Sequence, residues 1–396
     1  MTTTRNGNGN TVSCVLHVAF ELGQDRWKLA FTTGLGQKSR FRNVTARDRA
    51  AVLHEIARAK KRFQLPEDAP VVSCYEAGRD GAWLHRWLLS VGVRNHIIDS
   101  SSIEVNRKLR RAKNDALDAD ALVRLLVRYE LGEKKAFRVV FVPSEFEEDQ
   151  RQLHRELTSL KDERTMLNNQ MKGHLCSQGV TLAKVDKNFV AWLDEQRLWN
   201  GRPVSAELQA RLCRIFERWQ KVHEQITKLE TEQRRRVRTD STPDVDKIRQ
   251  LLQLKGLGVC GAWTFFREIG WRRGLSSKKV GALLGLVPTP YSSCSSQREL
   301  GISKAGNKHL RRLLVELAWC WLRHQPNSAI SLWFQRRFRE GPRHRRIGIV
   351  AVARKLAVAL WRYLERGEVP PGAELVTWQS KMKGAKQISS AASSAA

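Results

Sequence analysis

The segment from residue 205 to 237 places an apolar residue at every third or fourth position. These apolar positions are Leu208, Leu212, Ile215, Trp219, Val222, Ile226 and Leu229. The spacing predicts one long helix with a single apolar stripe, which another helix has to cover. Residues 151–175 show the same spacing with one interruption, at Arg164. The two helices are therefore predicted to form an antiparallel coiled-coil arm or a dimer contact, or else to pack on a core as ordinary amphipathic helices.

The residues before this helix pair alternate between short apolar strands and amphipathic helices. Residues 12–34 have the pattern of a β-hairpin, and "PVVSCYEA" and "RNHIIDS" are two further apolar strands separated by helical segments. Such alternation is typical of an α/β domain, which we place at 11–145. A helical connector at 146–240 and an almost entirely helical domain at 241–368 follow it. The small, polar residues 369–396 are expected to be disordered.

The charge of the chain indicates a polyanionic partner. Lys and Arg number 70 against 40 Asp and Glu, which gives a formal net charge of +30. So large a charge costs self-repulsion unless a partner neutralises it, and nucleic acid fits better than a membrane surface. The seven cysteines include no C-x-x-C pair, and no apolar run reaches the ~20 residues of a membrane span. We therefore expect a soluble, cytoplasmic protein with reduced cysteines and no zinc site.

Four carboxylates occupy positions where α/β domains commonly have active-site residues. Glu21 and Glu76 each lie at the end of an apolar strand, and Asp115 and Asp118 open the helix "NDALDADALVRLLVRYELG". Strand ends meet at one edge of a sheet, while helix residues three apart share a face. Taken singly, the aspartates are explained as first-turn acids favoured by the helix dipole, and Glu21 as a turn residue. Taken together, the four predict a site for one or two hard cations.

The stretch "GISKAGNKHLRR" has the pattern of a loop that enters a basic helix. Lys304, Lys308, Arg311 and Arg312, with the capping candidate Asn307, are expected to contact phosphates. The serine-rich "YSSCSS" lies just before it. Serine-rich segments are usually polar loops, so composition alone names no nucleophile here.

Five segments, in this order, resemble the insertion-sequence-110 family of transposases, which are relatives of the Piv-type DNA invertases. They are "YEAGRDGAWLHRWL", "KNDALDADAL", "LKGLGVCGAWTFFREIG", "ALLGLVPTPYSS" and "GISKAGNKHLRR". The resemblance covers about residues 12–365. It implies a RuvC-like (RNase H-like) α/β domain, a coiled-coil connector and a mostly α-helical transposase domain that carries a catalytic serine.

The resemblance also implies roles for particular residues. The family's Mg²⁺-binding acidic tetrad falls on Glu21, Glu76, Asp115 and Asp118. The first position departs from the family's usual Asp, although Glu is still an oxygen ligand. The family's nucleophile falls on Ser293, directly before the position where relatives have glycine. Ser292 is the alternative, because "SSCSS" lacks those glycines.

A member of this family is expected to be a DNA recombinase that inserts and excises its own element, guided by a bridge RNA, through a phosphoserine linkage. Its expected partners are the DNA element ends and target, the guide RNA, and further copies of the chain in a dimer or tetramer formed through the coiled coil. The expected location is the prokaryotic cytoplasm, at the nucleoid. Two alternatives stay open: a metal-dependent Holliday-junction-type nuclease without a covalent intermediate, and a catalytically decayed RNA- or DNA-binding protein, suggested by Glu21.

Overall fold

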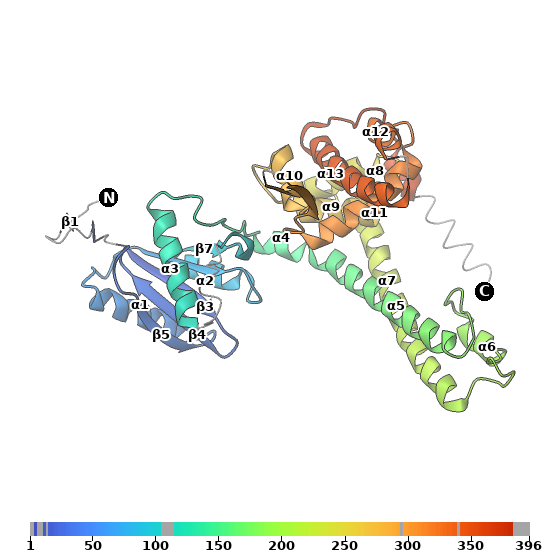
Figure 1. Cartoon of the computed structure of the whole chain (residues 1–396), viewed down its shortest axis with the longest axis horizontal. Coiled ribbons are helices and arrows are strands. Elements are labelled where there is room, and N and C mark those ends of the chain that lie inside the picture. Colours follow the sequence, from blue (N-terminus) through green and yellow to red (C-terminus); the bar gives the residue numbers. More distant parts are fainter. Residues whose placement is uncertain are drawn as a thin grey trace. The chain divides into compact units, whose positions relative to one another are not determined.

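The structure, a computed structural model, describes residues 15–103, 115–293, 296–338 and 341–382, together with two short paired strands, β1 (Thr4–Arg5) and β2 (Thr11–Val12). The chain divides into two compact units, Met1–Val142 and Pro143–Ala396 (Figure 1). No helix among the described residues has the length and apolar character needed to cross a membrane.

The first unit is built on a five-stranded mixed sheet with the order β5-β4-β3-β6-β7. Its strands are β3 (Leu16–Leu22), β4 (Arg26–Thr32), β5 (Arg40–Thr45), β6 (Val71–Glu76) and β7 (Arg94–Ile98). Strands β3, β4 and β5 form an antiparallel meander, and β6 and β7 continue the sheet parallel to β3. The predicted hairpin, the two further strands and the mixed α/β class are confirmed, whereas β5 was not predicted.

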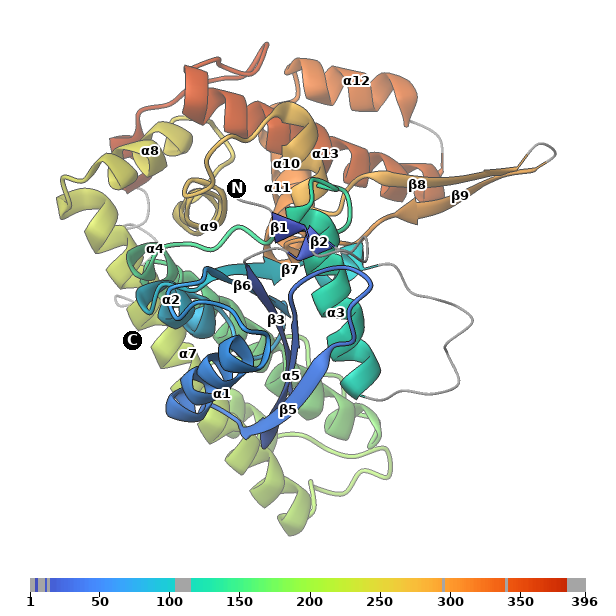
Figure 2. The ribbon, with the colours of Figure 1, turned by 90° about the vertical axis from the view of Figure 1, so that its left-hand side faces the viewer.

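Helices cover both faces of this sheet (Figure 2). They are α1 (Arg49–Arg62), α2 (Trp83–Ser90) and α3 (Asp115–Glu130). Side chains alternate along β3, so Val18 and Phe20 pack against α1 and α2 on one face. Ala19 and Cys74 pack under α3 on the other face. The sheet is therefore buried on both faces, which explains the almost continuous apolar character of β3 and β6.

The second unit begins with two long helices that pack antiparallel in one chain. The helices of this part are α4 (Glu145–Asp149), α5 (Gln152–Cys176), α6 (Phe189–Asp194) and α7 (Ala206–Thr239). Lys161 of α5 pairs with Glu230 of α7 at 2.7 Å, while Arg164 lies 3.3 Å from His223, so the helices run in opposite directions. We call the pair α5–α7 the arm. Of the open alternatives, the structure has the antiparallel arm, while its description as a coiled coil and the predicted homo-oligomer stay predictions.

The seam of the arm is filled from within the chain. The predicted positions Leu212, Ile215, Trp219, Val222 and Ile226 are all buried. They pack with Leu157, Leu167, Met171 and Leu175 of α5. Burial of these apolar surfaces is what holds two long helices together outside a larger core.

A charge in this seam is expected to unfold the arm. Leu212 is fully buried, so Leu212→Asp places an unpaired carboxylate among apolar side chains at a cost of about 3 kcal/mol or more. Hydrogen exchange should then show loss of protection in α5 and α7 but not in the first unit. Gln225→Asp, on the exposed side of α7, is the control. Unchanged protection in Leu212→Asp, together with a lower oligomeric mass, would instead show that the seam joins two chains.

The rest of the second unit is a mostly helical domain, as expected. Its elements are α8 (Pro243–Leu252), α9 (Val259–Ile269), α10 (Ser277–Leu283), β8 (Pro288–Ser293), β9 (Ser296–Ile302), α11 (Lys308–His324), α12 (Ala329–Arg337) and α13 (Pro342–Arg366). One core joins them, and Trp263, Phe265 and Trp321 are its largest fully buried side chains.

The serine-rich segment departs from the expected loop. Strands β8 and β9 form an antiparallel hairpin between α10 and α11, with Ser292 opposite Gln297 and Ser293 opposite Ser296. The segment lacks the apolar alternation by which a half-buried strand is recognised, so the sequence pattern did not predict the hairpin.

The C-terminal segment from 369, expected to be disordered, is ordered up to residue 382. The backbone N–H of Val376 donates to the carbonyl of Gln253 at 2.7 Å. Lys381 donates to the carbonyls of Leu254 and Leu257 at 2.6 and 2.8 Å, and burial lowers its pKa to about 8. These backbone contacts are invisible to composition, which is why the disorder prediction was wrong for 369–382. Residues 383–396 lie outside the described residues.

Candidate functional site

Two of the four predicted carboxylates lie side by side at one edge of the sheet. Phe20 of β3 is in register with Tyr75 of the parallel strand β6, so the next residues, Glu21 and Glu76, are neighbours at the carboxyl ends of their strands. By strand alternation both extend on the face that α3 covers. Both line a pocket of about 370 Å³, together with Asp80. Adjacent carboxylate oxygens of this kind fit part of the ligand shell of a hard divalent cation.

The other two predicted carboxylates, Asp115 and Asp118, lie in the first turn of α3, the helix that covers this face. They do not line the pocket of Glu21 and Glu76. Within the described ranges, no group of three or more His, Cys, Asp or Glu side chains is placed to hold a metal ion. Residues 104–114, which lead into α3, lie outside the described part. The structure thus brings the tetrad together by pairs and not as a whole.

The two candidate nucleophiles lie at the distal end of β8. Ser293 is the last residue of the strand and Ser292 precedes it. Their side chains, like those of all residues from 290 to 300, are outside what the structure describes. The choice between the two serines therefore stays as the sequence left it.

Two glycines fix the base of this hairpin. Gly285 follows α10 and Gly306 precedes α11, and both have positive φ angles, 62° and 109°. A Cβ on Gly285 would lie 2.2 Å from the carbonyl oxygen of Ala305, and one on Gly306 would lie 2.2 Å from that of Leu283. Both the conformation and the close approach therefore require glycine. As a result, two of the recognised segments, "ALLGLVPTPYSS" and "GISKAGNKHLRR", are held against each other.

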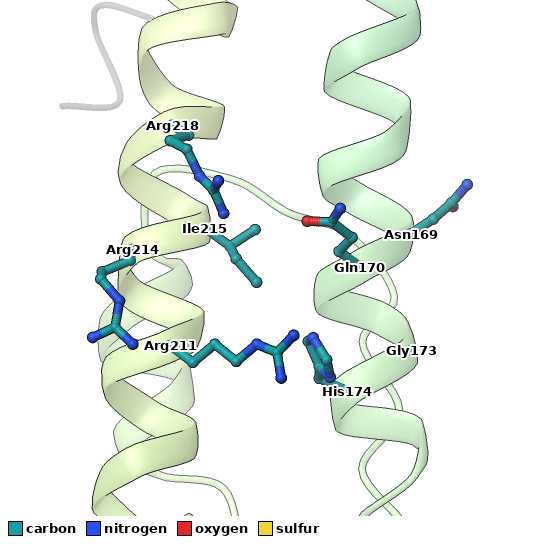
Figure 3. A pocket seen from close by; sticks show the side chains of 8 residues that line it. All are labelled: Asn169, Gln170, Gly173, His174, Arg211, Arg214, Ile215 and Arg218. Carbon is teal, nitrogen blue, oxygen red and sulfur yellow. The ribbon is translucent and has the colours of Figure 1, made fainter.

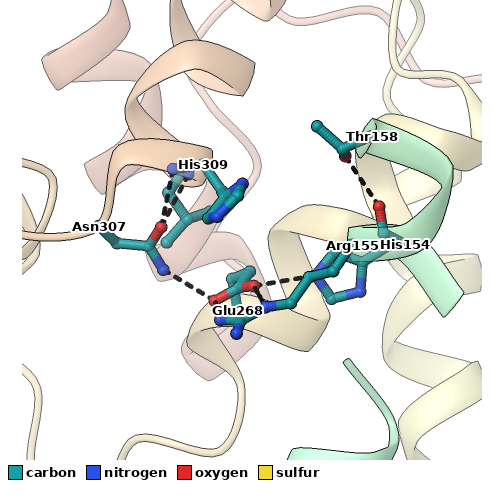
Figure 4. A network of polar contacts seen from close by, with 7 residues as sticks. His154, Arg155, Thr158, Glu268, Asn307 and His309 are labelled. Carbon is teal, nitrogen blue, oxygen red and sulfur yellow. Dashed lines mark hydrogen bonds and ion pairs between the residues drawn. The ribbon is translucent and has the colours of Figure 1, made fainter. Parts of the chain in front are cut away.

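A buried polar network ties this base to the arm (Figure 4). Glu268, at the end of α9, is 0% exposed. Its carboxylate lies 2.9 Å from Nε2 of His154 and accepts hydrogen bonds from Arg155 at 2.8 and 3.1 Å and from the amide of Asn307 at 2.8 Å. Burial opposes ionisation of Glu268, but the hydrogen bonds from His154 and Arg155 outweigh it and hold the pKa of this carboxyl below its usual range. The network therefore joins α5, α9 and the start of α11.

Asn307 links the start of α11 to Glu268. Its side-chain oxygen accepts from the backbone N–H groups of His309 and Leu310 at 3.0 and 3.1 Å, so it caps α11 as the sequence indicated. Its amide group is the one that donates to Glu268. Sequence reasoning did not find Glu268; the available signal was one acidic residue near the end of the apolar segment "AWTFFREIG".

Removal of the Glu268 carboxylate is expected to destabilise the second unit. Glu268→Ala leaves the buried His154 and the partly exposed Arg155 without their partner, which costs about 3 kcal/mol. The control is Asp162→Ala, whose exposed ion pair with Arg312 is worth about 1 kcal/mol or less.

The same carboxylate predicts a pH dependence. Because its folded pKa is depressed, its contribution is present above the unfolded pKa and is lost as the pH falls below about 4. Urea melts at neutral and acidic pH measure both effects, and equal stability of Glu268→Ala and the parent chain would contradict this role.

The predicted nucleic-acid contacts differ in their surroundings. Arg311 donates to the carbonyls of Leu284 and Lys304 at 3.1 and 2.9 Å. Arg312 forms ion pairs with Asp162 and Glu316. Lys304 and Lys308 are exposed. Arg312 is exposed as well, but its guanidinium is already engaged in these ion pairs. Phosphate contact by these residues and by Asn307 stays a prediction.

Comparison with known proteins identifies the family. A model described as "Transposase IS116/IS110/IS902 family" matches residues 248–332. The chain is 37% identical over 382 residues to "Putative transposase y4rJ" of Sinorhizobium fredii, an alignment that covers 91% of this chain and 95% of the relative. The chain belongs to the IS116/IS110/IS902 family of transposases. It is also 28% identical to the transposase for insertion sequence element IS1328 of Yersinia enterocolitica, over 65% of this chain and 73% of the relative.

The chain is likewise 26% identical to the transposase for insertion sequence element IS1111A of Coxiella burnetii, over 72% of this chain and 75% of the relative. Membership makes the chain an enzyme of DNA transposition. The matched residues of this transposase, 248–332, contain Glu268, both glycines at the base of the hairpin, and the whole β8–β9 hairpin. The geometry at the base of the hairpin therefore lies in the part of the chain that the family model describes.

Proposed function

We propose that this transposase recombines DNA through a serine nucleophile on the β8–β9 hairpin, assisted by a divalent metal on a RuvC-like first unit. Ser293 is the nucleophile and Ser292 the alternative. The observation that carries the proposal is the convergence of three recognised segments at the base of this hairpin: Glu268 contacts Asn307, and Gly285 packs on the loop before α11. These contacts anchor the base of the hairpin, which supports the assignment of the nucleophile to this segment.

The proposed reaction balances as a transfer of one phosphoryl group. The Ser293 oxygen forms a bond to phosphorus and loses its proton, while a deoxyribose oxygen leaves and takes up a proton. Attack by the deoxyribose hydroxyl of another strand on the phosphoserine then restores the serine. A serine hydroxyl is a weak nucleophile at neutral pH and needs activation.

Glu21, Glu76, Asp115 and Asp118 are the residues that would hold Mg²⁺, which supplies Lewis-acid polarisation of the phosphoryl oxygens. The adjacency of Glu21 and Glu76 in the sheet supports the assignment of the first pair. Lys304 and Lys308, exposed beside the hairpin's second strand and at the start of α11, would hold the phosphates on either side of the reacting one.

We further propose that a bridge RNA selects the element ends and the target, and that the chain acts as a homo-oligomer. The net charge of +30 supports binding to RNA as well as DNA, because many phosphates can be neutralised. The proposed nucleophile and the proposed metal ligands belong to different units, so the reaction requires both units to be present.

The test is an assay of the purified transposase with labelled DNA and RNA taken from the flanks of its own gene, with Mg²⁺ present. The proposal predicts a protein–DNA adduct that survives denaturant and depends on the RNA. Hydrolysed DNA ends without an adduct would favour the metal-dependent nuclease. Tight binding without cleavage in either Mg²⁺ or Mn²⁺ would favour the decayed binding protein.

A further inference from the structure

One side of the arm carries an open groove that neither the proposed chemistry nor the family match uses. It lies between α5 and α7 and has a volume of about 680 Å³ (Figure 3). The polar side chains along it are Asn169, Gln170, His174, Arg211, Arg214 and Arg218. We call it the arm groove. Figure 3 shows Arg211 extending across it toward His174, and Gln170 pointing into it from α5.

The three arginines of the arm groove form an exposed positive cluster. They occupy positions i, i+3 and i+7 of α7, so they lie along one side of the helix. In the part of the chain that the structure describes, their guanidinium groups have no ion pair and no hydrogen bond. Like charges at this spacing repel one another, so the cluster lowers the stability of the arm unless an external anion binds there.

Other arginines of the same helix are neutralised within the chain. Arg234 pairs with Glu230, and Arg235 and Arg236 both pair with Glu232. Helix α7 thus has two arginine clusters, one with acidic partners and one without. The contrast indicates that the arm groove receives its negative charge from a ligand.

The chemistry of the arm groove favours RNA as that ligand. Guanidinium groups bind phosphate oxygens through paired hydrogen bonds. The amide of Gln170 both donates and accepts, which matches a ribose 2′-hydroxyl, itself a donor and an acceptor. DNA offers only acceptor oxygens along its backbone, so it leaves the acceptor of this amide unused.

An exposed tryptophan at the same end of the arm adds a place for a base. Trp199 is 77% exposed and lies in the connection between α5 and α7. Its backbone N–H donates to the carbonyl of Gln178 at 3.1 Å, just beyond the end of α5. The neighbouring cations Arg197 and Arg202 flank it in the sequence. An exposed indole between two arginines is a stacking platform for an unpaired base.

We propose that the arm groove binds the backbone of a single-stranded RNA segment, with Trp199 stacked on one of its bases. The inference rests on the proposed function in one respect, that this transposase binds RNA, and it requires neither the serine nor the metal. It assigns to the arm a direct role in holding the RNA.

The test compares two triple variants that remove the same charge from the same helix. Arg211→Gln, Arg214→Gln and Arg218→Gln together remove the unpartnered cluster, while Arg234→Gln, Arg235→Gln and Arg236→Gln remove the paired one. The probe is a labelled single-stranded RNA of mixed sequence, with DNA of the same sequence in a second arm. The arm-groove variant should bind RNA roughly tenfold more weakly at ~0.1 M salt, with a slope of log affinity against log salt reduced by about 2. The paired variant should change affinity by less than about twofold.

Trp199 gives an independent measurement on an exposed site. Trp199→Ala should weaken RNA binding by about tenfold with an unchanged salt slope, and Trp199→Phe should restore most of it. Photo-crosslinking of the probe to the parent chain should label peptides of α7 that contain Arg211 to Arg218.

The outcomes separate the inference from the proposed function. If the parent chain binds the RNA and both triple variants bind it equally, the arm groove is not the site, while the proposed function stands. If the arm-groove variant loses DNA binding and keeps RNA binding, the assignment of RNA is wrong. If the parent chain binds no RNA, the RNA part of the proposed function fails and this inference fails with it.

Discussion

Glu21→Gln combined with Glu76→Gln is expected to lower DNA strand cleavage by about a thousandfold or more, with nucleic-acid binding changed by less than about twofold. Both side chains line one pocket at adjacent strand ends, so the double variant removes two negative charges from one place. The amides keep the size of the side chains but bind hard cations far more weakly. The loss should therefore fall on the chemical step.

A matched control and a second readout make this test specific. Glu67→Gln combined with Asp68→Asn removes the same charge from an exposed turn of the same unit and should cleave normally. Mg²⁺ should raise the melting temperature of the parent chain and of the control, but not that of the glutamate variant. Normal cleavage by the glutamate variant would remove Glu21 and Glu76 from the mechanism.

Asp115→Asn combined with Asp118→Asn distinguishes two explanations for the other pair. If they belong to the same metal site, cleavage falls as far as in the glutamate variant. If they are first-turn acids that the helix dipole favours, the variant loses about 1 kcal/mol of stability and keeps its activity. The comparison is needed because the structure does not place these two side chains in the pocket.

The secondary structure of the first unit was predictable because its strands and helices have clear periods. Alternating apolar residues gave β3 and β4, and helical spacing gave α1 and α3. Strand β5, "RFRNVT", is an edge strand whose side chains are mostly outside the core, so no apolar pattern marked it. The sequence predicted an antiparallel arm only as one of several alternatives, because the same apolar stripe can pack on a partner helix in either chain.

The sequence predicted the candidate site only where the order of the strands along the chain determines which residues are neighbours. Strand ends on adjacent parallel strands have to meet, so the proximity of Glu21 and Glu76 followed from the sequence. Glu268 contacts His154 and Asn307, which are 114 and 39 positions away along the chain. Such contacts depend on how three helices pack, and no local pattern encodes them. The β8–β9 hairpin and the structure of residues 369–382 were not predicted for the same reason, since both depend on backbone hydrogen bonds to other parts of the chain.

Ser293→Ala is expected to abolish the covalent protein–DNA adduct and recombination. The family resemblance selects it, because it lies directly before the position where relatives are expected to have glycine. The exposed Lys304 and Lys308, proposed to hold the flanking phosphates, follow it in the sequence. Alanine removes the oxygen that is proposed to bond to phosphorus, so the expected loss is complete and not graded. Ser295→Ala should keep the adduct. An adduct retained by Ser293→Ala but lost by Ser292→Ala would move the assignment by one residue.

The most direct measurement of the serine mechanism is mass spectrometry of the adduct after nuclease and protease digestion. The parent chain should yield a phosphodeoxynucleotide attached to the peptide that contains Ser292 and Ser293, with fragmentation placing it on Ser293. A chain carrying both Ser292→Ala and Ser293→Ala should yield no such peptide and no recombined DNA. Normal recombination by that double variant would contradict the account.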